Sequence, residues 1–468
     1  MTSTPKLPDL IAELVGIVGA TQVLTDPADI APFVTDWRGR YRGAAQCVVR
    51  PGNTAEVAAV VKACVEAGVP IVPQGGNTSL CGAATPDESG QAVVISLSRL
   101  NRIPTVDPKN NTILVEAGCT LAAVQEAARA VDRLFPLALA SEGSCQIGGN
   151  LSTNAGGVQV LRYGNTRELT LGLEVVLPSG EIWNGLRGLR KDNTGYDLKH
   201  LFIGAEGTLG IITGAVLKLF PLPKTQTTCW VNVASPAVAV DLLSQARSVF
   251  DAQLTAFELI SDAALGLVVT HIPDVARTTE ASPWYVLAEF SDAKPAAVAH
   301  WLHSRLEAGD VTDGVIAQSG PQAQKLWALR ENISEAQKIE GISIKHDIAV
   351  PVSQIAEFLV TADAALEKAF PGIRVVAFGH VGDGNLHYNL SKADAHDNAA
   401  FLASEPEVHR IVHDIVHALS GSISAEHGIG QLKRAEILRY KDPVELGLMR
   451  SVKQALDPRA LMNPGKIL

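Results

Sequence analysis

The sequence predicts a multidomain protein built from both helices and strands. At 468 residues, of which 47% are apolar, the chain is too long for one hydrophobic core and can fill two or three. Alanine-rich stretches with helical periodicity alternate along it with short runs of β-branched residues. Pro221 and Pro223, followed by the polar stretch KTQTT, mark a change of composition where we expect a domain boundary.

The composition excludes several classes of protein. A formal charge of -10 has the wrong sign for binding nucleic acid or an anionic membrane. The first residues lack a basic leader, and no stretch approaches the roughly 18 uncharged apolar residues of a membrane span. The six cysteines form no CxxC pair, which suits a reducing compartment. We therefore expect a soluble, cytoplasmic protein, and the sequence leaves open whether it is a monomer or a homodimer.

The first predicted elements surround a glycine-rich loop. A cap at Asn53 begins a helix that ends at Gly68, and a strand is expected at residues 69–72. The loop PQGGNTSLCG, residues 73–82, then leads to another strand at residues 93–97. The loop therefore joins strand to strand rather than strand to helix.

A second glycine segment separates a predicted helix from a run of strands. Thr120 opens an alanine-rich helix that reaches about Arg133, and SEGSCQIGGNLSTNAGG occupies residues 141–157. Strand patterns follow at residues 169–177, 181–183 and 210–220. From about residue 231 to residue 390, strands alternate with long helices.

Both glycine segments have the composition of an anion cradle. Backbone amides in such turns can converge on phosphate oxygens, and Gly75, Gly76 and Gly82 lack the Cβ that would obstruct a pyrophosphate. The first loop contains no lysine and no helix follows it directly, so neither an NTPase P-loop nor a Rossmann fingerprint fits. Two tight turns are the alternative. Two such segments, both rich in Asn, Ser and Thr, favour a nucleotide cofactor.

Six motifs resemble those of the vanillyl-alcohol-oxidase-type FAD family: GGNTSLCG, GSCQIGGNLSTNAGG, GAEGTLGIIT, FGHVGDGNLH, SAEHGIG and NPGKIL. Within it they are most similar to the branch of D-2-hydroxyglutarate and D-lactate dehydrogenases. The resemblance implies an α+β fold with a two-part FAD-binding domain (residues 1–222) and a substrate-binding domain with an antiparallel sheet (223–420). A C-terminal segment (421–468) would return to complete the active site and the flavin site. Relatives with covalent flavin commonly carry histidine where this chain has Asn77, so the resemblance implies noncovalent FAD.

The resemblance also implies which residues bind FAD. They come from the two glycine segments, from GAEGTLGI and from two later positions. These residues are Pro73, Gly75, Gly76, Asn77, Thr78, Ser79, Gly82, Glu142, Gly143, Ser144, Ile147, Gly148, Gly149, Asn150, Thr153, Asn154, Gly156, Gly157, Glu206, Gly207, Gly210, Ile211, Asn385 and Asn463.

Residues 375–390 predict a hairpin that carries two histidines. With a turn at residues 382–385, His380 lies directly opposite His387, close enough for both imidazoles to bind one metal ion. Asn389 shares that face and is expected to bind substrate. Two histidines that simply hydrogen-bond within a core are the alternative.

Glu426 is the best candidate for a third metal ligand, and the resemblance carries His380, His387 and Glu426 over as ligands. This set suits zinc first, and also manganese, cobalt or iron. His427, next to Glu426, is the expected general base, because a neutral imidazole can remove a hydroxyl proton near neutral pH. An ordinary turn histidine is the alternative for His427.

Substrate charge is predicted from LWALRENIS and IKHD. Arg330 and Ser334 are four residues apart on a predicted helix, so both can face one carboxylate. Lys345 supplies a second cation, and relatives that act on D-2-hydroxyglutarate resemble this arrangement. Any one of these charges can instead be a solvated surface group.

The expected function is oxidation of D-2-hydroxyglutarate to 2-oxoglutarate by hydride transfer from C2 to flavin N5. The alternatives are the same chemistry on D-lactate, glycolate or D-malate, a non-enzymatic flavin- or metal-binding protein, and a metal-dependent hydrolase. An electron-transfer flavoprotein, a quinone or oxygen would reoxidise the flavin.

A second histidine pattern is predicted to be structural. His409, His413 and His417 recur every four residues on a predicted helix. A strong apolar face lies beside them, which favours the flank of a packed helix over a metal site.

Overall fold

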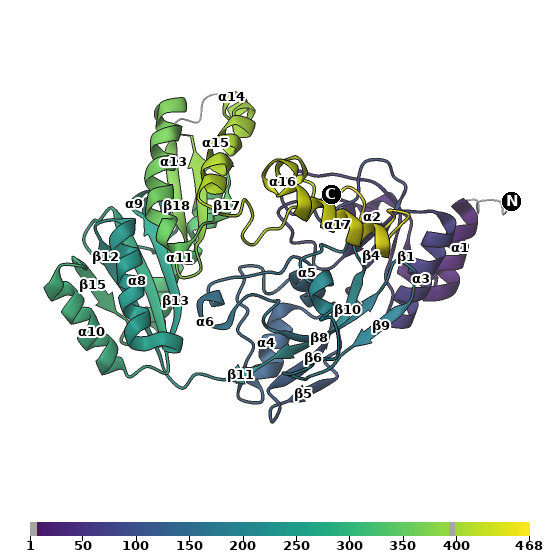
Figure 1. The fold of residues 1–468 in the computed structure, drawn as a ribbon, viewed down its shortest axis with the longest axis horizontal. Coiled ribbons are helices and arrows are strands. Elements are labelled where there is room, and N and C mark those ends of the chain that lie inside the picture. Colours follow the sequence, from purple (N-terminus) through teal and green to yellow (C-terminus); the bar gives the residue numbers. More distant parts are fainter. Residues whose placement is uncertain (1–6, 393–397) are drawn as a thin grey trace. The chain divides into compact units, whose positions relative to one another are not determined.

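The computed structural model describes residues 7–392 and 398–468, which form two compact units (Figure 1). The first unit contains the chain up to Gly156, Gly164–Leu222 and Glu426–Leu468. The second contains Gly157–Tyr163 and Pro223–Ala425. Each unit is therefore built from segments that are not continuous in the sequence.

The first unit contains two main sheets. In the four-stranded sheet, ordered β1-β2-β4-β3, the last three strands are parallel and β1 is antiparallel. The five-stranded sheet, ordered β5-β6-β10-β8-β9, is antiparallel, and β11 pairs with β7. The strands are β1 (Val23–Leu24), β2 (Ala45–Val49), β3 (Ile71–Gln74), β4 (Ala92–Ser96), β5 (Thr105–Asp107), β6 (Thr112–Glu116), β7 (Arg133–Leu134), β8 (Thr170–Val176), β9 (Ile182–Gly185), β10 (Ile211–Lys218) and β11 (Phe220–Pro221).

Local signals explain where the helices of the first unit begin and end. Asn53 accepts a hydrogen bond from the Glu56 amide, and Gly68 ends the helix with a φ of 72°, so the prediction for this helix is confirmed. The helices are α1 (Leu7–Val18), η1 (Ala20–Gln22), α2 (Pro27–Val34), α3 (Thr54–Ala67), α4 (Leu121–Arg129), α5 (Ile147–Ser152), α7 (Lys199–Phe202), α16 (Arg434–Tyr440) and α17 (Pro443–Leu456).

Two predicted elements of this unit have clearly different bounds, and one helix was not predicted. Helix α4 ends at Arg129, not near Arg133, because Asp132 has a left-handed φ of 56° and the chain then enters β7. Strand β3 begins at Ile71, two residues later than expected. The second glycine segment contains helix α5, which its glycine content concealed.

The second unit contains one antiparallel sheet, ordered β15-β12-β14-β13-β18-β19-β16, with β17 also paired to β19. Strand β13 is buried along its whole length and forms the centre of the core with Trp230 and Tyr285. The strands are β12 (Gln226–Val233), β13 (Leu254–Ser261), β14 (Trp284–Ser291), β15 (Asp313–Ile316), β16 (Ser343–Ile344), β17 (Asp347–Ala349), β18 (Arg374–His380) and β19 (Asn385–Ser391).

Helices pack onto the sheet of the second unit, for example α8 on β13 and α9 on β18. These helices are α6 (Val160–Tyr163), α8 (Pro236–Phe250), η2 (Asp251–Gln253), α9 (Asp262–His271), α10 (Pro295–Ala308), α11 (Gly320–Glu331), α12 (Ile333–Glu340), η3 (Val352–Gln354), α13 (Ile355–Ala369), α14 (Asn398–Ala403) and α15 (Glu405–Ala418).

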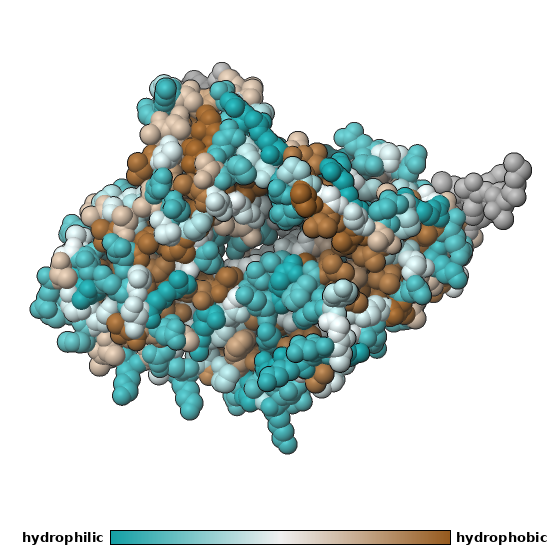
Figure 2. Space-filling model, in the orientation of Figure 1, coloured by the Kyte–Doolittle hydropathy of each residue, from teal (hydrophilic) through white to brown (hydrophobic). Residues whose placement is uncertain are grey.

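Hydrophilic and hydrophobic residues are interspersed on the visible face of the molecule (Figure 2). Within the described residues, no helix has the length and apolar character required to cross a bilayer.

Candidate active site

In the first unit, the two glycine segments lie against each other. A Cβ added to Gly76 would lie 2.1 Å from the carbonyl oxygen of Ser144, and one added to Gly75 would lie 3.4 Å from the Gln146 Cβ. Only glycine allows the first of these approaches, since backbone atoms cannot move aside as a flexible side chain can. Segments 60 residues apart in the sequence, as Gly82 and Glu142 are, thus form one surface.

The first loop is tied down at its base. The side-chain nitrogen of Gln74, Nε2, donates to the carbonyl oxygens of Phe33 and Ala84, both at 2.8 Å. Asn77 has a left-handed φ of 52°, and its side chain donates to the Thr35 carbonyl at 2.9 Å. These bonds set the path of the loop from within the protein, so its half-buried tip residues remain available to a ligand.

The glycines of the second segment have two different roles. Gly148 is a packing glycine, because an added Cβ would lie 2.8 Å from the Ala117 Cβ. Gly143 and Gly149 have no atom within 4 Å of an added Cβ and therefore border open space. The Gln146 side-chain oxygen is buried without a hydrogen-bond partner. Open backbone beside an unpartnered amide oxygen fits a polar ligand such as a nucleotide.

Glu206 joins the C-terminal segment to the first glycine loop. Its carboxylate, 5% exposed, accepts hydrogen bonds from the amides of Ile429 (2.7 Å) and Gly430 (2.8 Å). The Asn463 side chain donates to the Glu206 carbonyl at 2.7 Å and to the Ala83 carbonyl at 3.0 Å. Burial raises the pKa of Glu206. The buried Glu206 carboxylate thus holds the C-terminal segment in place at Ile429 and Gly430.

The structure places the residues of the implied FAD set in both units. Most of them lie in the first unit, on the β3–β4 loop, around α5 and between α7 and β10; only Gly157 and Asn385 lie in the second. Those in the first unit are Pro73, Gly75, Gly76, Asn77, Thr78, Ser79, Gly82, Glu142, Gly143, Ser144, Ile147, Gly148, Gly149, Asn150, Thr153, Asn154, Gly156, Glu206, Gly207, Gly210, Ile211 and Asn463.

In the second unit, the histidine hairpin has a different register from the one predicted. His387 pairs with Phe378, and this register places Asn385, not His387, opposite His380. The prediction of directly opposed histidines is therefore wrong by two residues. Asn385 is already part of β19, where it pairs with Ala349 of β17, and its side chain also donates to Asp347 and to the Ile348 carbonyl, both at 2.9 Å. The turn consequently occupies residues 381–384.

A shift of two residues keeps both histidines on one face of the sheet, because side chains alternate with a period of two. The rings of His380 and His387 lie diagonally, with centroids 5.6 Å apart. Two imidazoles at that separation can still bind a common ion. Asn389 is on the same face, buried, and donates to the Gln337 side chain at 3.0 Å.

Glu258, which was not among the predicted site residues, orients His380. Its two oxygens contact His380 Nδ1 at 2.7 Å and Arg330 Nε at 2.8 Å, and its side chain is fully buried. Burial opposes ionisation, but the neighbouring His380 and Arg330 hold the pKa of Glu258 below its usual value. Because Nδ1 faces the Glu258 carboxylate, Nε2 is the nitrogen with which His380 would bind a metal ion, as in carboxylate–histidine–metal arrangements.

Arg330 and Ser334 do not lie on one helix, so that prediction is wrong. Arg330 is in α11 and Ser334 in α12, and the two helices meet at Asn332. The Asn332 side chain donates to the Ala328 carbonyl at 2.8 Å, which competes with the helical hydrogen bond to that oxygen. Arg330 is buried with its guanidinium 4.7 Å from the centre of the Phe378 ring, whereas Ser334 is exposed.

Lys345 lies in the short connection between β16 and β17 and is half-buried. The next residue, His346, donates its amide to the Asn389 side-chain oxygen at 3.2 Å. Asn389 therefore supports the connection that carries Lys345.

Glu426 and His427 begin the last stretch of the first unit, and both are half-buried. The residue before them, Ala425, donates its amide to the Asp347 carbonyl at 3.2 Å. Asp347 pairs directly with His387. The second unit thus holds the chain one residue before Glu426 against the strand next to His387.

One signal in the sequence points to Glu258. It is the single charged residue in the otherwise neutral strand LTAFELIS, and a carboxylate in such a strand must be paired when buried. Asp383, in the turn after His380, has its pKa raised to about 6 by burial. Asp383 follows His380, a predicted metal ligand, by three residues, so the sequence could also have pointed to it.

Two family models match the chain. One, described as an FAD binding domain, matches residues 45–185, and the other, FAD linked oxidases, C-terminal domain, matches residues 222–467. A D-2-hydroxyglutarate dehydrogenase of Xanthomonas citri pv. viticola is 41% identical over 98% of this chain and 96% of its own. The mitochondrial D-2-hydroxyglutarate dehydrogenase of Bos taurus is 38% identical over 96% of this chain and 81% of its own.

Solved structures share the fold. p-Cresol methylhydroxylase superposes with a TM-score of 0.77 at 18% identity, covering 98% of this chain and 96% of its own. An alkyldihydroxyacetonephosphate synthase gives 0.74 at 19% identity, covering 99% and 86%. The expected α+β fold of the vanillyl-alcohol-oxidase type is confirmed.

Proposed function

We propose that this chain, which belongs to the family of FAD-linked oxidases, oxidises D-2-hydroxyglutarate to 2-oxoglutarate. Its class is that of the FAD-dependent D-2-hydroxyacid dehydrogenases. The observation that carries the proposal is the histidine face of β18 and β19, where Glu258 orients His380 next to His387 while two cationic residues, Arg330 and Lys345, lie on elements packed around the same sheet.

FAD is held noncovalently in this proposal. The open backbone at Gly143 and Gly149, the unpartnered Gln146 oxygen and the loop around Asn77 support a nucleotide at the glycine surface. Bound FAD would supply the acceptor for the C2 hydride at its N5. Because Asn77 has no nucleophilic nitrogen comparable to that of histidine, no covalent link is expected there.

His380, His387 and Glu426 are the proposed ligands of a divalent ion, zinc first, with manganese, cobalt or iron as alternatives. Such an ion would make the substrate hydroxyl more acidic. Glu426 is proposed because the chain is anchored to Asp347 one residue earlier, beside the strand of His387.

His427 is the proposed base. It takes the proton of the C2 hydroxyl while the C2–H bond breaks with both of its electrons, and the C2–O bond becomes a carbonyl. No covalent intermediate with the protein is needed.

Arg330 and Ser334 would bind one carboxylate, and Lys345 the other, with Asn389 supporting the Lys345 connection. Since Arg330 Nε is bound to Glu258, only the outer nitrogens of the guanidinium are proposed to meet substrate. Ser334, which is exposed on α12, would be the lesser of these contacts.

We further propose a cytoplasmic enzyme, because its cysteines are buried and unlinked by disulfides. An electron-transfer flavoprotein or a quinone would reoxidise the flavin.

The substrate proposal is tested by adding D-2-hydroxyglutarate to the anaerobic, metal-replete protein. The flavin absorbance should bleach, and D-lactate, glycolate and D-malate should bleach it more slowly. A flavin that stays oxidised with every 2-hydroxy acid would instead favour a binding protein without activity.

Two lysine variants separate a dicarboxylate from a monocarboxylate substrate. Lys345→Ala should lower kcat/KM for D-2-hydroxyglutarate by about 10- to 100-fold, the value of a hydrogen bond to a charged group, with little change for D-lactate. Lys338→Ala, at an exposed ion pair on α12, is the matched control and should change neither. Equal losses on both acids would reject Lys345 as a contact to the distal carboxylate.

Removal of the metal and substitution of the proposed base test two separate parts of the mechanism. A strong chelator should abolish turnover while FAD stays bound, because the proposed ligands lie outside both glycine segments. His427→Asn should lower kcat by roughly 10²- to 10⁴-fold, the contribution of a general base, without releasing metal. Full activity after verified metal removal would rule out the metal-dependent mechanism.

Gly149→Ala tests the cofactor site. The added methyl meets no protein atom, so the apoprotein should unfold as the wild type does, while FAD binding weakens. Gly266→Ala, also on a helix and with open space around it, is the control and should leave FAD binding unchanged.

A further inference from the structure

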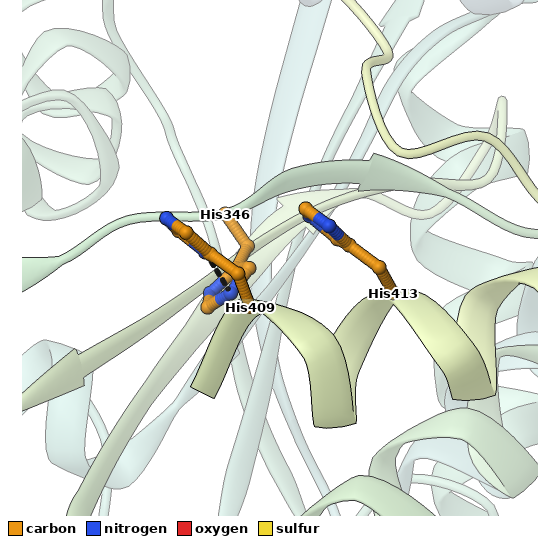
Figure 3. Close-up of side chains that lie close together, drawn as sticks. All are labelled: His346, His409 and His413. Atoms are coloured by element: carbon orange, nitrogen blue, oxygen red, sulfur yellow. Dashed lines mark hydrogen bonds between the residues drawn. The ribbon is translucent and has the colours of Figure 1, made fainter. Parts of the chain in front are cut away.

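Three histidines meet in the second unit, apart from the His380 and His387 face. His346 lies in the connection between β16 and β17, and His409 and His413 are one turn apart on α15 (Figure 3). One ring nitrogen from each lies within 4.8 Å of the other two. The spacing of the α15 histidines predicted a structural flank, and no pattern in the sequence links them to His346.

The separations are close to those of a metal site. His409 Nδ1 and His346 Nε2 are 2.9 Å apart. With metal–nitrogen distances of 2.0–2.1 Å, two nitrogens of a tetrahedral zinc site are separated by about 3.3 Å. The close pair would open by a few tenths of an ångström, and His413 would approach by a small side-chain rotation. No backbone rearrangement is required.

Hydrogen bonds orient the ring nitrogens as a metal site needs. His346 Nδ1 lies 2.9 Å from the Tyr388 carbonyl, which can only accept, so that nitrogen carries the hydrogen and Nε2 presents its lone pair. His409 Nε2 lies 3.3 Å from the Glu405 carboxylate. A carbonyl and a carboxylate on the far side of ligand histidines are the usual supports of a bound metal ion.

The hydrogen-bond inventory of the three rings leaves room for an ion between them. With Nδ1 of His346 donating to Tyr388, His409 Nδ1 must donate to His346, yet His409 Nε2 also faces an acceptor, Glu405. A neutral imidazole carries one hydrogen and cannot donate from both nitrogens. Either a second proton on His409 or a cation between the rings meets this demand, and with a cation His409 Nε2 donates to Glu405 while Nδ1 binds the ion.

We propose that His346, His409 and His413 bind one zinc ion, with the fourth position open to water or to an exogenous ligand. Three imidazoles select zinc, copper or nickel over calcium and magnesium, which prefer oxygen ligands. His346 and His413 are both 2% exposed, so the site is largely shielded from solvent. The ion would fasten α15 to the connection that carries Lys345, and it requires neither flavin nor substrate.

Metal content tests the proposal. The untagged, FAD-loaded chain is equilibrated with zinc, passed through a desalting column and analysed for zinc per chain. His409→Gln should retain one zinc fewer than the wild type, and His417→Gln, the next histidine on α15, should retain the wild-type number. The same difference should persist in a His387→Gln background, which removes the ion of the proposed active site. Equal zinc in His409→Gln and the wild type would overturn the proposal.

A labelling experiment avoids any effect of substitution on folding. Diethylpyrocarbonate modifies accessible imidazoles, and peptide mass spectrometry measures the extent at each histidine. Zinc should protect His409 at least several-fold and leave the exposed His417 unchanged. Modification of His409 that is the same with and without zinc would contradict the site.

Discussion

Glu206 in the first unit and Glu258 in the second are both buried, yet different groups stabilise them. Glu206 accepts hydrogen bonds from two backbone amides at 2.7 and 2.8 Å. Glu258 contacts the charged side chain of Arg330 at 2.8 Å and the imidazole of His380 at 2.7 Å. Burial raises the pKa of Glu206, whereas at Glu258 burial is outweighed by His380 and Arg330, which lower the pKa.

The two carboxylates therefore have different roles: Glu206 holds a segment of the chain, and Glu258 orients side chains. Backbone amides belong to the path of the chain, so Glu206 fixes where the C-terminal segment runs. Arg330 and His380 are themselves candidate ligand-binding groups, so Glu258 fixes which of their atoms remain available. Removing Glu258 would leave the buried Arg330 and His380 without their partner, which is costlier than leaving two neutral backbone amides without an acceptor.

The largest expected effect is that of Glu258→Gln. The variant should lose about 3–5 kcal/mol of unfolding free energy, because the buried Arg330 loses its counter-charge. Denaturant unfolding followed by circular dichroism measures the loss. Glu340→Gln is the control, since Glu340 also contacts an arginine and a histidine, Arg374 and His271, but at the partly exposed surface. Its loss should be under about 1 kcal/mol, and equal losses would contradict the role of burial.

Glu206→Gln should have an intermediate effect, about 1–3 kcal/mol, because one of two backbone amides loses its acceptor. Hydrogen exchange should accelerate selectively at residues 428–431, where those amides lie. Exchange that stays as slow as in the wild type would show that the carboxylate does not hold this segment.

The smallest effect is expected at Glu289, a third buried carboxylate whose hydrogen-bond donors are neutral: Trp327 at 3.0 Å, with Thr228, Thr255 and Gln226 at longer range. Glu289→Gln should change stability by less than about 1 kcal/mol, because an amide oxygen still accepts from Trp327.

The pH dependence sharpens this case. Burial raises the pKa of Glu289 in the folded protein, so the folded state binds the Glu289 proton more tightly than the unfolded state does. The wild type therefore loses stability as the pH rises above the pKa that Glu289 has in the unfolded chain. Glu289→Gln lacks this loss. Its stability relative to the wild type should therefore increase from pH 5 to pH 7, and a decrease would be inconsistent with the raised pKa.

Local signals in the sequence predicted what depends on short-range chemistry. The cap at Asn53 and the left-handed Gly68 bound α3 as expected. The loop between β3 and β4 does join strand to strand. These features follow from a few neighbouring residues and need no knowledge of the rest of the fold.

Features that depend on distant partners were missed or misplaced. The hairpin register is set by Asn385, which bonds to β17, an element too short to be recognised in the sequence. The helix break at Asn332 is accompanied by a side-chain hydrogen bond from Asn332 to the Ala328 carbonyl. His346 joins the α15 histidines only because the sheet brings residues 63 positions apart together. None of these partners is visible in a pattern of spacing.

The buried native cysteines should not react with thiol reagents, which allows a single introduced cysteine to be labelled selectively. All six thiols are buried, and burial raises the pKa of Cys47 and Cys229 to about 12 and that of Cys119 to about 11. Because the thiolate is the reactive form, maleimides should leave the native chain unmodified. A cysteine introduced at an exposed position such as Val444, which is 73% exposed on α17, would then be a single attachment point for a fluorophore or a spin label.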